Sequence, residues 1–251
     1  MGKHYLSTLT HAALFALLSL FFLPTLVFAE HKPAISRVFQ YSTLDALLKG
    51  QLEGRLTLSE LAKNGDFGLG TLSGVDGEMV AVDGQFYRVD DHGVASLVAG
   101  DSKTPFAIVI PFRATQTFSV VEALTLNQLG RFIDQRIRDQ DLIHAIRIDG
   151  RFKQLLVRSV PKQSKPFRPL ADVLKTDEVR FEYKDVEGTL VGFRAPDSMS
   201  GINVAGYHFH FIDTGRSFGG HVLELITDSG IVKLNQASHL ELQLPVENTT
   251  H

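Results

Sequence analysis

The chain has 251 residues, of which 25 are lysine or arginine and 28 are aspartate or glutamate, and its formal net charge at pH 7 is −3. This slight acidic excess argues against a nucleic-acid-binding surface. The sequence contains no cysteine, which excludes thiolate catalysis and disulfide bonds, so any metal must be held by histidines and carboxylates.

Residues 1–29 have the features of a secretion signal. Lys3 lies in a short charged start, residues 12–22 form an apolar run, and Val27-Phe-Ala is a small-x-small cleavage motif. The apolar run is shorter than the roughly 20 residues that a membrane-spanning helix needs. We therefore expect export to the periplasm or the medium, cleavage before Glu30, and no membrane anchor after cleavage.

Two short helices are predicted near the start of the mature chain. In the stretch Ser42-Thr-Leu-Asp-Ala-Leu-Leu-Lys-Gly a hydroxyl cap opens the first helix, and Gly50 ends it. Thr57 and Glu60 have the spacing of a capping box at the start of the second helix, which ends at the Asn-Gly pair of residues 64–65.

Residues 66–89 alternate apolar and small residues and contain Asp-Gly pairs at 76–77 and 83–84. This pattern predicts consecutive β-hairpins. A dinucleotide-binding loop needs its glycines between a strand and a long helix, whereas Gly68 and Gly70 are followed by further strand and turn signals. We therefore exclude a nucleotide-binding loop here.

Further elements follow in alternation. Strands are predicted at residues 106–110 and 117–121, and Thr125 then caps a helix. The apolar positions that recur at helical spacing in this helix are Leu126, Leu129, Ile133 and Ile137.

Residues 142–160 are predicted to form a β-hairpin that turns at Asp149-Gly150. A turn at this point places Arg147 opposite Phe152 and puts Arg158 on the same face.

Arg158 lies near the end of an apolar strand, where an unpaired guanidinium would be costly to bury. It therefore needs an anionic partner, which is either an internal acid such as Asp141 or the carboxylate of a substrate. Arg147, on the same predicted face, is a competing candidate for the substrate.

The segment 161–169 contains three prolines and three basic residues and is the one linker-like stretch of the mature chain. A domain boundary near residue 165 is therefore plausible, and the alternative is a long surface loop. Strands are predicted after it at 179–183, 188–193 and 240–244.

A histidine-rich hairpin is predicted at residues 206–221. His208 and His210 share one face of its first strand, because successive side chains of a strand alternate. The opposite face is aromatic and would anchor the site, with Tyr207, Phe209 and Phe211. If the turn is centred between residues 215 and 216, His210 lies directly opposite His221, about 5 Å away. Three imidazoles that converge in this way match the open three-ligand pattern of a catalytic zinc.

The remaining candidates have simpler interpretations. His92, His144 and His239 are each isolated along the chain and are interpreted as structural or exposed. Glu78 follows an Asp-Gly turn, and the pattern alone favours a solvated carboxylate there.

Five ordered motifs together resemble the α-acetolactate decarboxylase family, over about residues 37–245. The motifs are Gly65-Asp-Phe-Gly-Leu-Gly-Thr, Asp76-Gly-Glu-Met, Ile146-Arg-Ile-Asp-Gly-Arg-Phe, Val157-Arg-Ser-Val-Pro and Gly206-Tyr-His-Phe-His-Phe.

The resemblance implies conversion of (S)-2-acetolactate to (R)-acetoin and carbon dioxide, with Zn²⁺ held by His208, His210 and His221. A zinc ion would stabilise the enediolate that remains when carbon dioxide leaves a β-keto acid. Arg158 matches the family arginine that holds the substrate carboxylate or delivers the stereospecific proton, and Glu78 matches a carboxylate near the metal. A homodimer is also implied.

The expected architecture is therefore a mixed α/β (α+β) fold with two β-rich lobes and the metal in the cleft between them. The N-terminal lobe would span residues 30–165 and contain the helices, and the C-terminal lobe would span residues 166–251 and contain the histidine hairpin.

One departure from the family and two alternatives remain. The family continues into a tail with a further glutamate near the zinc, and neither Glu241 nor Glu247 matches it convincingly. A cupin-like metalloenzyme is one alternative, but its motif expects a glutamate where this chain has Thr214. The other alternative is an exported metal-binding module without turnover.

Overall fold

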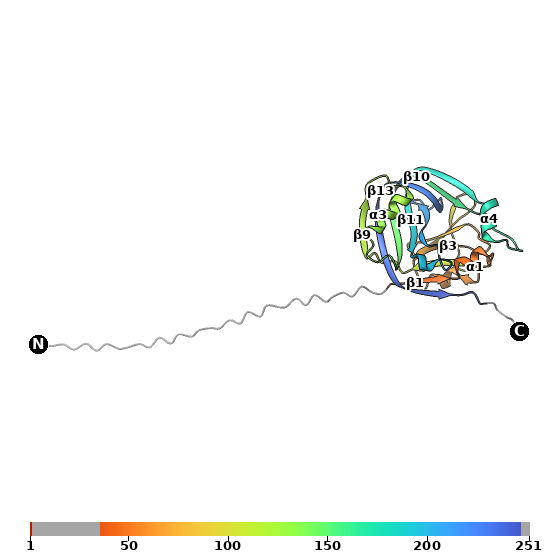
Figure 1. The fold of residues 1–251 in the computed structure, drawn as a ribbon, viewed down its shortest axis with the longest axis horizontal. Helices are drawn as coiled ribbons and strands as arrows, with labels where there is room; N and C mark the ends of the chain where they lie inside the picture. Colours follow the sequence, from red (N-terminus) through yellow and green to blue (C-terminus); the bar gives the residue numbers. More distant parts are fainter. Residues whose placement is uncertain (2–35, 247–251) are drawn as a thin grey trace. The chain divides into compact units, whose positions relative to one another are not determined.

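The computed structural model describes residues 1 and 36–246, and Figure 1 shows that most of the body is built from strands. The expected secretion signal, apart from Met1, lies outside the described residues. The strands are β1 (Ser36–Tyr41), β2 (Leu56–Thr57), β3 (Phe67–Thr71), β4 (Glu78–Val82), β5 (Gln85–Val89), β6 (Ala95–Leu97), β7 (Lys103–Thr104), β8 (Phe106–Ile110), β9 (Gln116–Val120), β10 (Ile143–Ser159), β11 (Val179–Ala195), β12 (Gly206–Asp213) and β13 (Gly219–Gln243).

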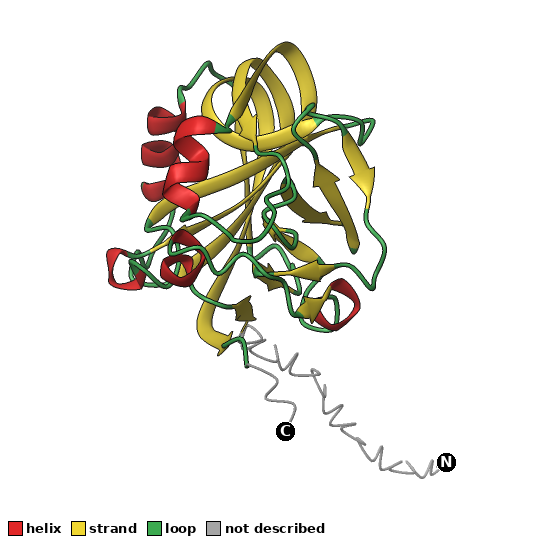
Figure 2. Ribbon diagram, turned by 90° about the vertical axis from the view of Figure 1, so that its right-hand side faces the viewer, coloured by secondary structure: helices red, strands yellow, loops and turns green. Residues whose placement is uncertain are grey.

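The helices are short and lie outside the strands (Figure 2). They are α1 (Leu44–Leu48), α2 (Leu58–Leu61), α3 (Leu126–Asp134), α4 (Leu170–Thr176) and a single 3-10 turn, η1 (Asp197–Met199). The predicted capping box at Thr57 and Glu60 is confirmed, and Thr125 caps α3 with Gln128 in the same reciprocal way. Among the residues that the structure describes, no helix is long and apolar enough to cross a membrane.

One large sheet of eleven strands has the order β10-β11-β12-β13-β1-β8-β3-β4-β5-β6, with β9 paired to β13. The predicted hairpins of residues 66–89 are confirmed as β3, β4 and β5. Their tight turns have positive φ at Gly77, Asp83 and Gly84, a conformation that glycine and aspartate tolerate better than most residues.

The four strands β10 to β13 pair in a closed cycle. β10 pairs with β11, β11 with β12, β12 with β13, and β13 with β10. The predicted histidine-rich hairpin, residues 206–221, is part of this cycle and is confirmed as β12 and the start of β13. Its backbone is therefore paired on both sides, which fixes the positions of the histidines it bears.

The predicted hairpin turn at Asp149-Gly150 is wrong, because β10 runs straight through it. Gly150 is paired with Gly188 on one side and Gly230 on the other, so three glycines form a row across the sheet. A Cβ on Gly150 would lie 2.4 Å from the carbonyl oxygen of Ser229. Glycine is required here for close strand approach and not for a turn.

Two apolar clusters hold the site-bearing strands. One packs α3 against the cycle and contains Leu129 and Ile133 together with Phe209 and Phe211. The other joins β3, β4 and β8 to the opposite face of β11 and β12, with Val80 and Ile212 among its members. The histidine-bearing face of β12 is thereby set against β4.

The mixed fold, mostly strands with few helices, agrees with the expected class. Strand pairing joins segments from both sides of residue 165, since β10 pairs with both β11 and β13. The division into lobes at residues 30–165 and 166–251, with the metal in a cleft between them, stays a prediction.

Candidate metal centre

The histidine hairpin has the predicted register. His210 of β12 is paired with His221 of β13. The carboxylate of Asp213 accepts hydrogen bonds from the backbone N–H groups of Gly215, Ser217 and Phe218, and this network holds the connecting loop in one conformation. The strands and the loop together position the two histidines before any metal binds.

The aromatic face of β12 anchors the hairpin, as expected from its sequence. Phe209 and Phe211 are buried, and the Phe211 ring packs edge-on against Phe152 of β10 at 5.6 Å. The Tyr207 hydroxyl donates a hydrogen bond to Asp134 of α3 at 2.8 Å. The histidines on the other face are therefore held by a packed aromatic layer behind them.

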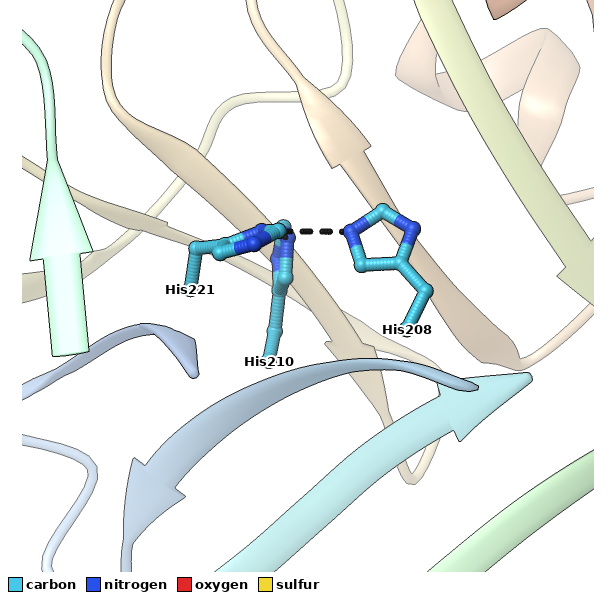
Figure 3. Close-up of side chains that lie close together, drawn as sticks. All are labelled: His208, His210 and His221. Carbon is cyan, nitrogen blue, oxygen red and sulfur yellow. Dashed lines mark hydrogen bonds between the residues drawn. The ribbon is translucent and has the colours of Figure 1, made fainter. Parts of the chain in front are cut away.

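The three imidazoles converge on one point (Figure 3). Nδ1 of His221 lies 3.2 Å from Nε2 of His208 and 3.3 Å from Nε2 of His210. Two nitrogens bound to one tetrahedral zinc at 2.0–2.1 Å are about 3.3 Å apart. The donor atoms are thus already spaced for a single small ion.

Burial keeps all three imidazoles neutral, which is the state that binds a metal. It lowers the pKa of His210 to about 3, and it also lowers the pKa of His208 and of His221, with the Arg158 charge acting in the same direction. The Nδ1–H of His210 donates to the backbone carbonyl of Met79 at 2.8 Å. This bond fixes the tautomer, so that Nε2 of His210 presents its lone pair to the centre.

Glu78 stands beside the histidines and is not a solvated turn residue. It is the first residue of β4, and its side chain is 7% exposed. Its Oε2 lies 3.3 Å from Nε2 of His210, and its Oε1 accepts a hydrogen bond from Arg158 at 2.8 Å. Burial raises the pKa of Glu78, and this effect is only partly offset by Arg158. A carboxylate of this kind can hold a proton or approach a metal.

Arg158, near the end of β10, lies beside the Glu78 carboxylate. It is paired across the sheet with His221 of β13, and its side chain is 14% exposed. Its anionic partners are Glu78, at 2.8 Å, and Glu178, at 3.3 Å. Asp141, named from the sequence as an internal partner, is not among them.

The competing arginine is engaged elsewhere. Arg147 forms hydrogen bonds with Asp149 at 2.9 Å and with Asp83 at 2.5 Å. Its predicted place opposite Phe152 was wrong because it assumed a turn that does not exist. The predicted face, shared with Arg158, is confirmed, because direct cross-strand pairs lead from Arg158 through His221, His210 and Val191 to Arg147. Its strand neighbours are Val191 and Lys233.

Two features of the centre were missed in the sequence. Glu178 and the carbonyl of Met79 reach the centre only through the pairing of β10 with β11 and the packing of β4 under β12, and no local motif signals either contact. Of the two late carboxylates considered as a tail glutamate, the structure describes only Glu241. Glu241 forms an ion pair with Arg37, and Glu247 lies outside the described residues.

The other histidines in the described part of the chain, His92, His144 and His239, do not join the centre. His92 and His239 are exposed, whereas His144 is buried, with its Nε2 2.8 Å from the carbonyl of Asp139. His208, His210 and His221 thus form a neutral donor set, with a buried acid and a guanidinium at one side. Such an arrangement can bind a divalent ion and an anionic substrate together.

Comparison with known proteins agrees with the motifs. A family model described as alpha-acetolactate decarboxylase matches residues 38–251. The alpha-acetolactate decarboxylase of Methanosarcina mazei is 44% identical over 208 residues, which cover 83% of this chain and 72% of the relative. That of Bacillus subtilis is 38% identical over 211 residues, which cover 84% of this chain and 82% of the relative.

Similarity extends to three-dimensional structure. The crystal structure of alpha-acetolactate decarboxylase from Bacillus subtilis strain 168 matches this fold with a TM-score of 0.82 at 39% identity, covering 86% of this chain and 91% of that chain.

Proposed function

The chain belongs to the alpha-acetolactate decarboxylase family of carboxy-lyases, and we propose that it is a zinc enzyme that converts (S)-2-acetolactate to (R)-acetoin and carbon dioxide. The proposal of zinc rests on the spacing of the imidazole nitrogens of His208, His210 and His221, at 3.2 and 3.3 Å. The proposed substrate class rests on Arg158 next to these histidines, because its guanidinium can bind the one carboxylate of 2-acetolactate.

The donor set fits zinc. Neutral imidazole is a preferred zinc ligand, and three protein ligands leave a position for substrate, as in catalytic zinc sites. When bound, zinc supplies positive charge that stabilises the enediolate left by the loss of carbon dioxide. The His210 bond to the Met79 carbonyl supports this role, because such outer contacts orient metal ligands.

Arg158 binds the substrate carboxylate in this proposal. The bond between the carboxylate carbon and its neighbour breaks, carbon dioxide leaves, and the electron pair moves to the former ketone oxygen. A proton then adds to the carbon that lost the carboxylate. Arg158 lies at the edge of the centre, where it can orient the carboxylate first and face the reacting carbon afterwards.

Glu78 holds the guanidinium of Arg158 in place through its Oε1, and its Oε2 faces His210. Because burial raises its pKa, Glu78 is suited to keep or pass on a proton close to the reacting oxygens. We therefore propose that Glu78, beside the metal, holds Arg158 and takes part in proton transfer.

The test is acetoin formation from racemic 2-acetolactate by the mature protein, before and after chelation and after zinc is restored. We expect half of the racemate to react, with activity that disappears on chelation and returns with zinc. A rate that chelation leaves unchanged would remove zinc from the mechanism. Zinc binding without acetoin formation would instead support a binding module.

We also propose export and a homodimer. The signal-like segment 1–29 supports export, and the family resemblance supports the dimer. Mass spectrometry of the protein isolated from its natural host should find Glu30 as the first residue, and light scattering on the purified mature chain should give twice the chain mass. An uncleaved N-terminus or a monomer mass would refute the corresponding proposal.

A further inference from the structure

Glu178 lies at the junction between α4 and β11, and the fold fixes its position from both sides. The helix ends with the N–H of Asp177 donating to the carbonyl of Val173 at 2.8 Å, and Val173 is fully buried. On the other side, Val179 is already paired with Ser159 of β10. Glu178 therefore has little freedom to move away from the end of β10.

The Glu178 carboxylate lies between two arginines. One oxygen is 3.3 Å from Nε of Arg158, and the other accepts a hydrogen bond from Nε of Arg180 at 2.6 Å. Arg158 and Arg180 are direct cross-strand partners on β10 and β11, a placement in which like charges repel. The side chains of Glu178 and Arg158 are only 13% and 14% exposed, so solvent screens their contact weakly, whereas the Arg180 side chain is 62% exposed and its charge is screened more strongly.

The guanidinium of Arg158 is thus held at two points. Glu78 accepts a hydrogen bond from Nη1, and the Glu178 carboxylate lies close to Nε. Because the guanidinium is planar and its donors have fixed directions, two carboxylates at different nitrogens define the plane of the group and the direction of Nη2. A single carboxylate would leave the group free to rotate about one contact.

We propose that Glu178 is a positioning residue for Arg158: by holding Nε, it sets the guanidinium plane so that Nη2 meets the substrate carboxylate. This inference rests on the proposed role of Arg158 and deepens it. Glu178 itself does not touch the substrate. Its second contact, with Arg180, offsets part of the repulsion between the two cross-strand arginines.

The test is a double-mutant cycle with Glu178→Gln and Arg158→Lys, measured by acetoin formation. Glu182→Gln is the matched control, because Glu182 is an exposed glutamate on β11, four residues after Glu178. We expect E178Q to lower kcat/KM by about tenfold, mainly through a higher KM, with zinc content unchanged and E182Q unaffected. Lysine has no Nε–H group for Glu178 to hold, so in the R158K background the E178Q substitution should lower kcat/KM by less than about twofold.

The outcomes separate the two proposals. If R158K keeps full activity, the role of Arg158 fails, and this inference fails with it. If R158K is impaired but E178Q behaves like E182Q, or if E178Q costs the same in both backgrounds, only the positioning role of Glu178 is overturned. Should E178Q not fold, Glu178→Asp keeps the charge with a shorter reach, and it should raise KM by a smaller factor while the zinc content stays unchanged. An unchanged KM for a folded E178D would also overturn the inference.

Discussion

Arg158 and His221 lie directly opposite each other on the neighbouring strands β10 and β13. On its other side His221 is paired with His210 of β12, so the guanidinium and two of the imidazoles come from one row across three strands. Cross-strand partners are about 5 Å apart. Sheet geometry, and not a mobile loop, therefore sets the distance between the anion-binding group and the metal ligands.

Replacing Arg158 with lysine should lower kcat/KM for 2-acetolactate by about 100-fold or more, because the single nitrogen of a lysine cannot reproduce the planar fork in which Nη1 contacts Glu78 while Nη2 faces the substrate. Steady-state acetoin formation measures the loss. Arg147→Lys on the same strand is the control, since Arg147 contacts Asp149 and Asp83 instead. An equal loss in R147K would show that the effect is not specific to the centre.

Replacing Glu78 with glutamine should reduce kcat more than tenfold while the protein stays folded, because the side chain keeps its shape but loses the charge that holds Arg158 and the ability to carry a proton. Zinc titration of E78Q tests separately whether Glu78 also supports metal binding. Affinity reduced by about 10- to 100-fold is expected for a residue beside the metal. Full activity in E78Q would exclude it from the reaction.

Zinc should stabilise the folded chain through the three histidines. Free zinc at 100 times its dissociation constant adds about 2.7 kcal/mol to the free energy of unfolding, which is seen as a higher Tm in thermal unfolding with and without chelator. His221→Ala should lose this difference, while His239→Ala, at an exposed histidine, should keep it. A zinc-dependent Tm that survives in H221A would place the metal elsewhere.

The buried His144 should make stability fall at mildly acidic pH. Burial lowers its folded-state pKa below the unfolded value, which is about 6.5. Its stabilising contribution is therefore complete above that pH and is lost as the pH falls, by up to about 1.4 kcal/mol per pH unit. Urea unfolding of zinc-loaded protein at pH 7.5 and 5.5 should show a smaller drop for His144→Gln than for the unsubstituted chain.

The control for this measurement is His92→Gln, which removes an exposed histidine and should leave the drop unchanged. If His144→Gln and the unsubstituted chain lose the same stability between the two pH values, His144 does not contribute to the acid sensitivity.

Gly150→Ala should destabilise the fold by about 1–3 kcal/mol, because the new methyl group would meet the backbone of β13. Gly84→Ala is the comparison. Gly84 lies in a turn with φ of 75° and has open space around it. An alanine there is disfavoured only by the positive φ, which should lower the free energy of unfolding by about 1 kcal/mol. A smaller loss in G150A than in G84A, by chemical denaturation, would contradict the close strand approach at Gly150.

Local signals in the sequence were sufficient for the elements whose cause is local. The capping box predicted at Thr57 and the cap predicted at Thr125 depend on residues three positions apart, and the turns at residues 76–77 and 83–84 depend on glycine tolerating positive φ. The pairing of His210 with His221 follows from one hairpin and its turn centre. These interactions span few residues, so the order of residues alone defines them.

The Asp149-Gly150 pair shows where that reasoning fails. The same dipeptide that makes a turn at residues 83–84 lies inside a 17-residue strand here, because neighbouring strands on both sides supply its hydrogen bonds. A local preference for a turn is weak compared with two rows of strand pairing, and the sequence does not say which strands will be adjacent.

The sequence by itself determined the family, the three histidines and their register, since motifs and strand alternation are carried by the order of residues. Tertiary structure decided the rest of the centre. Glu78 is buried against His210, Arg158 is held by Glu78 and Glu178, and Arg147 is bound elsewhere. These contacts join residues far apart in the chain, and only the packing of β4 under β12 and the pairing of β10 with β11 bring them within reach.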